Sequence, residues 1–198
     1  METIRKELIA QFMTINAHTN LSAIRDPEGI QIKHIDDALE INKAIILKPG
    51  STLCDIGTGG GFPLLPIAIS NPKVQCTGID STKKKIDAVN EMIAHLKILN
   101  AKTIRTRAEE LKKEATPGGE GFDYVTARGV SYIDKLLPQI HHLVKKKGKL
   151  ILYKLYTSEE AQAIGTIIKR YRFVIQKKHT YQLFEGDIQR IIYVLKKI

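Results

Sequence analysis

The sequence predicts an α/β domain with a doubly wound, mostly parallel sheet, and three observations support this fold class. From residue 52 onward, short apolar runs alternate with segments of helical periodicity, which is the pattern of strands joined by crossover helices. A cluster of glycines follows the first apolar run, at the place where such sheets bind ligands. Two strand-like runs separated by a short polar turn close the chain, and they predict an antiparallel hairpin.

Two helices are expected before the sheet. The first has an apolar face with spacings of four, four and three, formed by Ile4, Leu8, Phe12 and Ile15. Asp26 followed by Pro27 marks the start of the second helix, which carries His34 in its apolar stripe and ends at Pro49-Gly50. We therefore expect residues 1–48 to form a short helical extension packed on a core of residues 49–198.

The core is expected to contain seven strands and four helices. The predicted strands are 52–56, 74–79, 103–107, 122–127, 149–155, 173–184 and 188–195. The predicted helices are 63–70, a segment capped by Ser81 or Thr82 that ends before Asn100, 133–144 and 161–171. Glu185-Gly186-Asp187 is the expected turn of the closing hairpin.

Composition narrows the class of protein. The chain has 198 residues and 43% hydrophobic content, which suits one compact domain. Its formal net charge of +10 favours an anionic partner, although charge alone leaves nucleic-acid binding open. No run approaches the roughly 18 apolar residues of a membrane span, and residues 1–20 lack a secretory signal. Cys54 and Cys76 form neither a disulfide framework nor a zinc motif, so we expect reduced thiols, no metal ion and a cytoplasmic protein.

The glycine cluster indicates a nucleoside ligand. Residues 55–63 read D-I-G-T-G-G-G-F-P. A dinucleotide fingerprint would place its third glycine where Phe62 stands, and a P-loop would need a Lys that is absent here. The D-x-G-x-G pattern instead resembles motif I of the class I methyltransferases, which bind S-adenosylmethionine. Asp80 ends the next predicted strand, where a carboxylate accepts hydrogen bonds from ribose hydroxyls in many nucleoside-binding folds. Ala108-Glu109 follows the third strand, where adenine is usually bound in that class.

In their order, the motifs resemble one family, the bacterial small-subunit ribosomal RNA guanine-N7 methyltransferases, formerly named for glucose-inhibited division protein B. The resemblance spans about residues 12–155. It rests on these segments: Asn20 to Asp26, His34 to Asp37, Asp55 to Pro63, Asp80-Ser81, Arg107 to Glu110 and Ala127-Arg128. The chain departs from the family pattern in a shorter N-terminal region, in Asp37-Ala38 and in Lys154-Leu155.

The resemblance implies a class I, Rossmann-like, seven-stranded fold and a specific activity. The methyl donor would be S-adenosylmethionine, and the target would be N7 of a guanine in the 530 loop of 16S rRNA. The partner would thus be 16S rRNA or the small ribosomal subunit, and we expect the protein to be a monomer. The family places its cofactor on the residues that here are Gly57, Phe62, Asp80, Ala108, Glu109 and Arg128.

This chemistry needs few catalytic groups. Guanine N7 carries a free lone pair, so no proton must leave before it attacks, and the protein mainly has to orient the reactants. We therefore expect no general base. Arg128 ends the fourth predicted strand, where its guanidinium would orient the cofactor or the guanine as the catalytic candidate.

Several residues are candidates for substrate contact. Asn20, Arg25 and His34 would shape the guanine pocket, although a hydrogen-bonded core histidine is an equal alternative for His34. Lys83, Lys84 and Lys85 follow Asp80 and are the first candidates for phosphate contact; Lys154 is a further candidate. Such lysine runs are also common on solvated surfaces. Aromatic residues make up only 6% of the chain, so base stacking is not the expected mode of RNA binding.

Other functions stay open on the sequence alone. A methyltransferase of this fold could act on another RNA, a protein or a small molecule. An NAD-linked oxidoreductase is disfavoured by Phe62, which replaces the third glycine of the dinucleotide fingerprint. A non-catalytic RNA-binding protein that keeps the fold is disfavoured by the intact Asp55, Gly57, Gly59 and Asp80.

Overall fold

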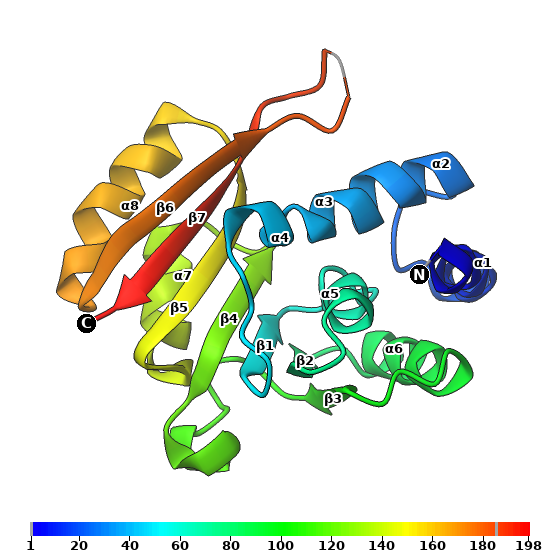
Figure 1. The fold of residues 1–198 in the computed structure, drawn as a ribbon, viewed down its shortest axis with the longest axis horizontal. Helices are drawn as coiled ribbons and strands as arrows, with labels where there is room; N and C mark the ends of the chain where they lie inside the picture. The colour runs from blue at the N-terminus through cyan, green and yellow to red at the C-terminus, as the bar shows by residue number, and fades with distance from the viewer. Residues whose placement is uncertain (1, 185) are drawn as a thin grey trace.

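A seven-stranded sheet forms the centre of the molecule (Figure 1). The computed structural model describes residues 2–184 and 186–198. The strand order is β3-β2-β1-β4-β5-β7-β6; β1 to β5 are parallel, and β7 is antiparallel to both neighbours. The strands are β1 (Thr52–Ile56), β2 (Gln75–Asp80), β3 (Ala101–Arg105), β4 (Phe122–Arg128), β5 (Val144–Leu155), β6 (Phe173–Tyr181) and β7 (Arg190–Lys197). The predicted doubly wound sheet with a closing antiparallel hairpin is confirmed.

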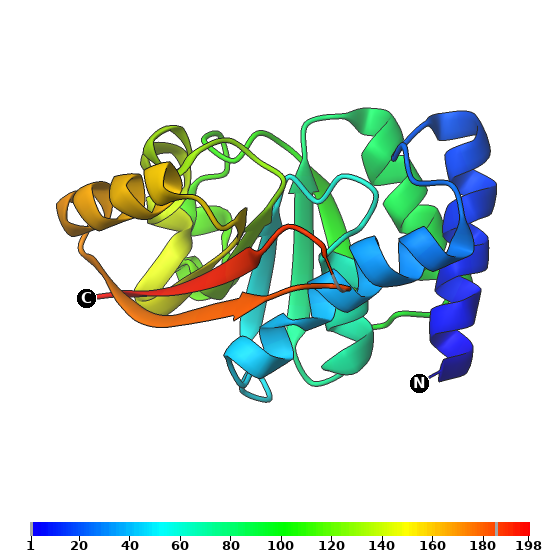
Figure 2. The same ribbon diagram turned by 90° about the horizontal axis from the view of Figure 1, so that it is seen from above.

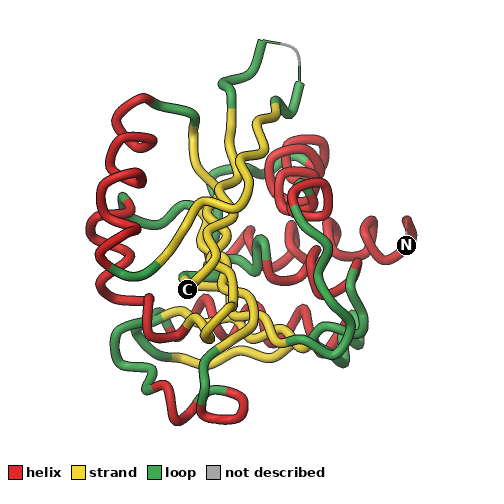
Figure 3. Tube along the Cα trace, turned by 60° about the vertical axis from the view of Figure 1, so that its left-hand side comes forward, coloured by secondary structure: helices red, strands yellow, loops and turns green. Residues whose placement is uncertain are grey.

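Helices cover both faces of the sheet, as the tube in Figure 3 shows. The α-helices are α1 (Glu2–Thr19), α2 (Pro27–Ile30), α3 (Asp37–Leu39), α4 (Ile41–Ala44), α5 (Leu64–Ser70), α6 (Lys83–His95), α7 (Ile133–Ile140) and α8 (Ser158–Arg170). Helices α1 to α6 share one apolar cluster with one face of the strands, and α7 and α8 share a second cluster with the other face. Alternation along β4 separates the two clusters, since Tyr124 joins the first and Val125 the second.

The N-terminal helices pack beside α5 and α6. Leu8, Phe12 and Ile15 of α1 are fully buried, as their spacing predicts, and α1 lies alongside α6 (Figure 2). Asp26 caps α2, because its Oδ1 accepts a hydrogen bond from the Gly29 N–H at 2.6 Å. The division of the chain at residue 48 into an extension and a core stays a prediction.

The prediction of one continuous helix from Asp26 to residue 48 is wrong. A π-helical turn, Gln31–Asp36, separates α2 from α3, and α4 ends at Ala44. Arg128 donates hydrogen bonds to the carbonyl oxygens of Lys33 (3.2 Å) and His34 (3.5 Å) inside this turn. A side chain from β4 thus contacts the widened turn, and π-turns of this kind occur often at functional sites.

Several other boundaries differ from the prediction. Helix α7 ends at Ile140, and a 3₁₀ turn, His141–Leu143, leads directly into β5. Lys147 adopts a φ of 63°, which no α-helix accommodates. Strand β3 begins at residue 101 and ends at residue 105. Two further 3₁₀ turns, Lys113–Ala115 and Pro117–Gly119, precede β4.

The closing hairpin has a longer connection than predicted. Its strand pairing ends at the Tyr181–Arg190 pair, so both strands are shorter at this end than the apolar pattern indicates. Residue 185 of the predicted 185–187 turn lies outside the described residues. No helix of the described part of the chain is long and apolar enough to cross a membrane.

Candidate functional site

A cavity of about 710 Å³ opens at the carboxyl ends of the parallel strands. Its walls come from α1 and the loop after it, the π-turn, the glycine loop, the segment after β4, the end of β5 and the closing hairpin. This position, beside the point where strand order reverses between β1 and β4, is where open α/β sheets bind ligands. The volume is typical of small-molecule sites.

The glycine loop forms one wall and is held by Asp80. Gly57 and Gly59 have φ values of 64° and 57°, which favour glycine. Asp80 Oδ2 accepts a hydrogen bond from the Gly59 N–H at 3.2 Å, and its Oδ1 accepts one from the Thr82 N–H at 2.8 Å. A Cβ added at Gly59 would meet only the Gly57 carbonyl oxygen, at 3.8 Å. At Gly59 the loop therefore presents its backbone to open space, with the Asp80 carboxylate directly behind it.

Asp55 supports this loop from below. Its side chain is fully buried, and Oδ1 accepts a hydrogen bond from the Thr126 hydroxyl at 2.8 Å. Burial raises the pKa of the Asp55 carboxyl to about 6, while the hydroxyl groups of Thr126 and Thr58 oppose that shift. Asp55 does not line the cavity, so it acts as a support of the strand–loop junction.

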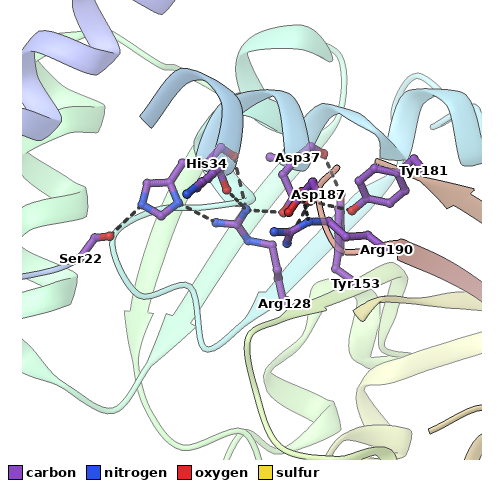
Figure 4. Close-up of polar contacts among 10 residues, drawn as sticks. Ser22, His34, Asp37, Arg128, Tyr153, Tyr181, Asp187 and Arg190 are labelled. Atoms are coloured by element: carbon purple, nitrogen blue, oxygen red, sulfur yellow. Dashed lines mark hydrogen bonds and ion pairs between the residues drawn. The ribbon is translucent and has the colours of Figure 1, made fainter. Parts of the chain in front are cut away.

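Arg128 is held on the opposite wall by Asp37 (Figure 4). Its Nη1 donates to Asp37 Oδ2 at 2.7 Å, and the Asp37 side chain is only 3% exposed. The other oxygen of Asp37 accepts a hydrogen bond from the Tyr181 hydroxyl at 2.7 Å and lies 3.8 Å from Arg190 Nη1. Because donors on two sides fix this carboxylate, the Arg128 guanidinium has one preferred orientation at the cavity wall.

His34 lies between Arg128 and an aromatic pair. Its Nε2 is 2.9 Å from the Ser22 hydroxyl, and its Nδ1 is 3.4 Å from Arg128 Nη2. The ring stacks on Phe62 with centroids 4.8 Å apart, and Phe12 contacts both rings edge-on. Burial, helped by the Arg128 charge, lowers the pKa of His34 to about 4. A neutral imidazole with the proton on Nε2 satisfies both contacts, and the ring is both packed and part of the cavity wall.

The buried His34 predicts a specific pH dependence of stability. In the unfolded chain this group titrates near 6.5 and in the fold near 4, so the unfolded state binds more protons between these values and stability rises with pH there. Relative to a His34→Phe variant, the wild-type free energy of unfolding should gain about 3 kcal/mol from pH 4 to pH 7.

Urea unfolding of both proteins across this range measures that gain. The raised pKa of Asp55 acts in the opposite direction, because this carboxyl binds more protons in the folded state. Both proteins contain Asp55, so its effect cancels when the free energy of unfolding of the variant is subtracted from that of the wild type. If the free energies of unfolding of the wild type and the His34→Phe variant differ by the same amount at every pH, His34 is not buried in its neutral form.

The structure brings six of the predicted site residues together and places the others elsewhere. The six that line the cavity are Gly57, Phe62, His34, Arg128, Lys85 and Lys154. Asp80 lies just behind the glycine loop. Ala108 is half-buried and Glu109 is exposed in the turn after β3, and neither lines the cavity. That turn is close to Asp80, because the Thr106 N–H donates to the Asp80 carbonyl oxygen at 3.1 Å.

The cationic candidates differ in their surroundings. Lys83 forms an exposed ion pair with Asp87 at 2.7 Å, and Lys84 is exposed outside the cavity. Lys85 Nζ lies 3.8 Å from Asp80 Oδ2. Arg25 Nη2 donates to Asn20 Oδ1 at 2.9 Å, and neither residue lines the cavity.

Lys154 is engaged within the protein. Its Nζ donates to the Ser131 carbonyl oxygen at 2.9 Å and pairs with Glu160 Oε1 at 2.7 Å. Both side chains are almost fully buried, and Glu160 also accepts a hydrogen bond from the Ile133 N–H at 3.3 Å. This pair ties the start of α8 to the segment after Arg128, so Lys154 shapes one cavity wall.

The site also contains residues that the sequence did not single out, among them Ser22, Glu160, Tyr181 and Arg190. Tyr181 and Arg190 face each other across the hairpin and reach Asp37 only because β7 inserts between β5 and β6. Glu160 reads as an ordinary acidic residue in the first turn of a helix. Ser22 lies within the segment from Asn20 to Asp26 that resembles the family, but its neighbours in the sequence do not indicate a contact with His34. Among residues 2–184 and 186–198, no group of three or more His, Cys, Asp or Glu side chains is placed to hold a metal ion.

Solved structures with this fold include methyltransferases. A SAM dependent methyltransferase from Aquifex aeolicus matches with a TM-score of 0.64 at 17% identity, covering 86% of this chain and 93% of that one. The YcgJ protein from Bacillus subtilis matches with a TM-score of 0.63 at 16% identity, covering 83% and 99%. These likenesses confirm the predicted class I, Rossmann-like fold.

Sequence relatives give the family. The family GidB, described as rRNA small subunit methyltransferase G, matches residues 2–190. The Ribosomal RNA small subunit methyltransferase G of Limosilactobacillus reuteri (strain DSM 20016) is 35% identical over 186 residues, covering 92% of this chain and 77% of the relative. The protein of the same name from Xanthomonas oryzae pv. oryzae is 30% identical over 190 residues, covering 96% and 84%. The chain therefore belongs to the rRNA small subunit methyltransferase G family.

Proposed function

We propose that this protein transfers a methyl group from S-adenosylmethionine to N7 of a guanine in the 530 loop of 16S rRNA. The observation that carries the proposal is that the glycine loop backed by Asp80 and the fixed Arg128 guanidinium face one cavity. The names of the relatives support ribosomal RNA as the substrate. The expected monomeric state and cytoplasmic location stay predictions.

The residues present fit this cofactor. The Gly59 backbone faces open space and allows a ligand to approach closely, and Asp80 offers a carboxylate for the ribose hydroxyls. Phe62 lines the same wall, while Ala108 and Glu109 lie in the turn beside Asp80 and remain the candidates for the adenine. S-adenosylmethionine, when bound here, supplies a methyl group that is already activated for transfer.

The chain's own residues would orient the reactants. Guanine N7 needs no base, and His34 in the cavity wall is held neutral with both ring nitrogens engaged. Arg128 would donate to O6 of the guanine or to a phosphate in the fixed geometry that Asp37 imposes. Orientation of the reactants can account for large rate gains without covalent catalysis or acid–base catalysis by the protein.

Methyl transfer to defined RNA tests the proposal. We expect labelled methyl from S-adenosylmethionine to enter 16S rRNA from cells that lack this protein, at a single guanine in the 530 loop. Primer extension after chemistry that cleaves at N7-methylguanine locates the site, and 23S rRNA serves as the control. Label in another RNA, in protein or in small molecules would favour the alternative of a different substrate on the same fold.

A further inference from the structure

Exposed apolar and aromatic side chains gather at the mouth of the cavity. Nine large side chains of this kind are exposed in the described residues, and five of them belong to the segments that frame the cavity. These five are between 46% and 65% exposed. We call them the mouth patch: Tyr132, Leu155, Tyr156, Phe184 and Ile188.

The mouth patch is continuous with the cavity wall. Tyr132 and Leu155 line the cavity, and Lys154 Nζ lies 5.9 Å from the centre of the Tyr132 ring. The Tyr156 N–H donates to the Gln189 carbonyl oxygen at 2.9 Å, which places Tyr156 beside Ile188. Phe184 belongs to the same hairpin connection, where its carbonyl oxygen accepts a hydrogen bond from the Asp187 N–H at 3.1 Å.

The charges around the patch favour an anionic partner. Lys33, Arg128 and Arg190 line the adjoining cavity. The acidic groups of this region are each paired with a cation: Asp37 with Arg128, Asp187 with Arg190 and Glu160 with Lys154. These pairs offset the charges of Arg128, Arg190 and Lys154, whereas the exposed Lys33 forms no ion pair within the described residues. Exposed rings beside such a cation are a combination that binds unpaired nucleotides, because rings stack on bases and cations contact phosphates.

We infer that the mouth patch stacks with unpaired RNA bases that flank the target guanine. This inference rests on the proposed function. A guanine that enters the cavity leaves its stack, so its neighbours lose stacking partners, and the exposed rings beside the cavity replace them. The low aromatic content predicts little base stacking, but Tyr132 lines the cavity, and Tyr156 and Phe184 belong to segments that adjoin cavity-lining residues.

A double variant, Tyr156→Ala with Phe184→Ala, tests the inference. Neither residue lines the cavity, so affinity for S-adenosylmethionine and the melting temperature should stay unchanged. Affinity for a hairpin RNA with an unpaired, guanine-containing loop should fall between about 5-fold and about 150-fold for each ring removed. The Tyr156→Phe variant should retain wild-type affinity. Leu99→Ala is the matched control, because Leu99 is 95% exposed elsewhere on the surface.

A base analogue reports the stacking directly. With 2-aminopurine next to the loop guanine, the wild type should change its fluorescence on binding and the double variant should not. Equal RNA affinity of the double variant and the wild type overturns the inference, as does an equal loss of affinity for a fully paired duplex. If the variant loses loop affinity while the wild type methylates no guanine N7, the inference stands and the proposed function fails.

Discussion

Replacing Arg128 with alanine should lower the turnover of methyl transfer to 16S rRNA by about 100-fold, the cost of losing productive orientation at the reacting atoms. The Arg128 side chain is 16% exposed and lines the cavity from the end of β4. Steady-state kinetics with saturating S-adenosylmethionine measures the loss. Arg128→Lys should recover little, because an ammonium cannot reproduce the forked donor geometry.

A structural effect must be separated from this loss. Removing Arg128 leaves the Asp37 carboxylate buried without its closest cation, and breaking a buried pair typically costs about 3–5 kcal/mol of stability. Adding Asp37→Asn to Arg128→Ala removes the unpaired charge. The double variant should regain thermal stability but not turnover. Turnover that returns together with stability would show that Arg128 only supports the fold.

Replacing Asp80 with alanine should weaken the binding of S-adenosylmethionine by roughly 10-fold to 150-fold, since hydrogen bonds to a charged group contribute about 1.5–3 kcal/mol. The variant also loses the contact that holds the Gly59 N–H. Asp80→Asn keeps one acceptor oxygen and should show an intermediate affinity.

Titration calorimetry measures these affinities directly. Asp87→Ala is the control, because Asp87 lies nearby on α6 and, within the described part of the chain, forms its ion pair with the exposed Lys83. A Kd of the Asp80→Ala protein equal to that of the wild type would exclude Asp80 from the cofactor site.

Local sequence signals predicted the sheet and the glycine loop. Parallel strands buried on both faces appear as short apolar runs, and the loop follows the first of them because the backbone there needs positive φ at Gly57 and Gly59. The strand ends were less predictable. Tyr181 pairs with Arg190, and nothing in the apolar pattern marks that pair as the last of the hairpin.

Contacts between separate elements explain the features of the site that the sequence did not predict. The π-turn at 31–36 holds carbonyl groups that bind Arg128 of a distant strand. The apolar periodicity of residues 31–36 does not indicate that Arg128 contacts them. Lys154 reads as a free cation near the substrate, yet its partner Glu160 lies on the next helix. The Arg128 contact depends on how residues 31–36 pack against the sheet, and the Lys154 contact depends on the turn between β5 and α8; residue periodicity specifies neither.

The Asp37 carboxylate has a consequence for the order in which the molecule assembles. Its partners come from β4, β6 and β7, so residue 37 is secured by strands that leave the ribosome well after it. Closure of so long a chain segment is costly in entropy and slow. The growing chain can form the β1–loop–β2 unit early. The cavity wall that holds Asp37 and Arg128 is complete only after the β6–β7 hairpin has docked. Methylating competence therefore requires the docked hairpin, and a nascent chain that still lacks its hairpin should be inactive.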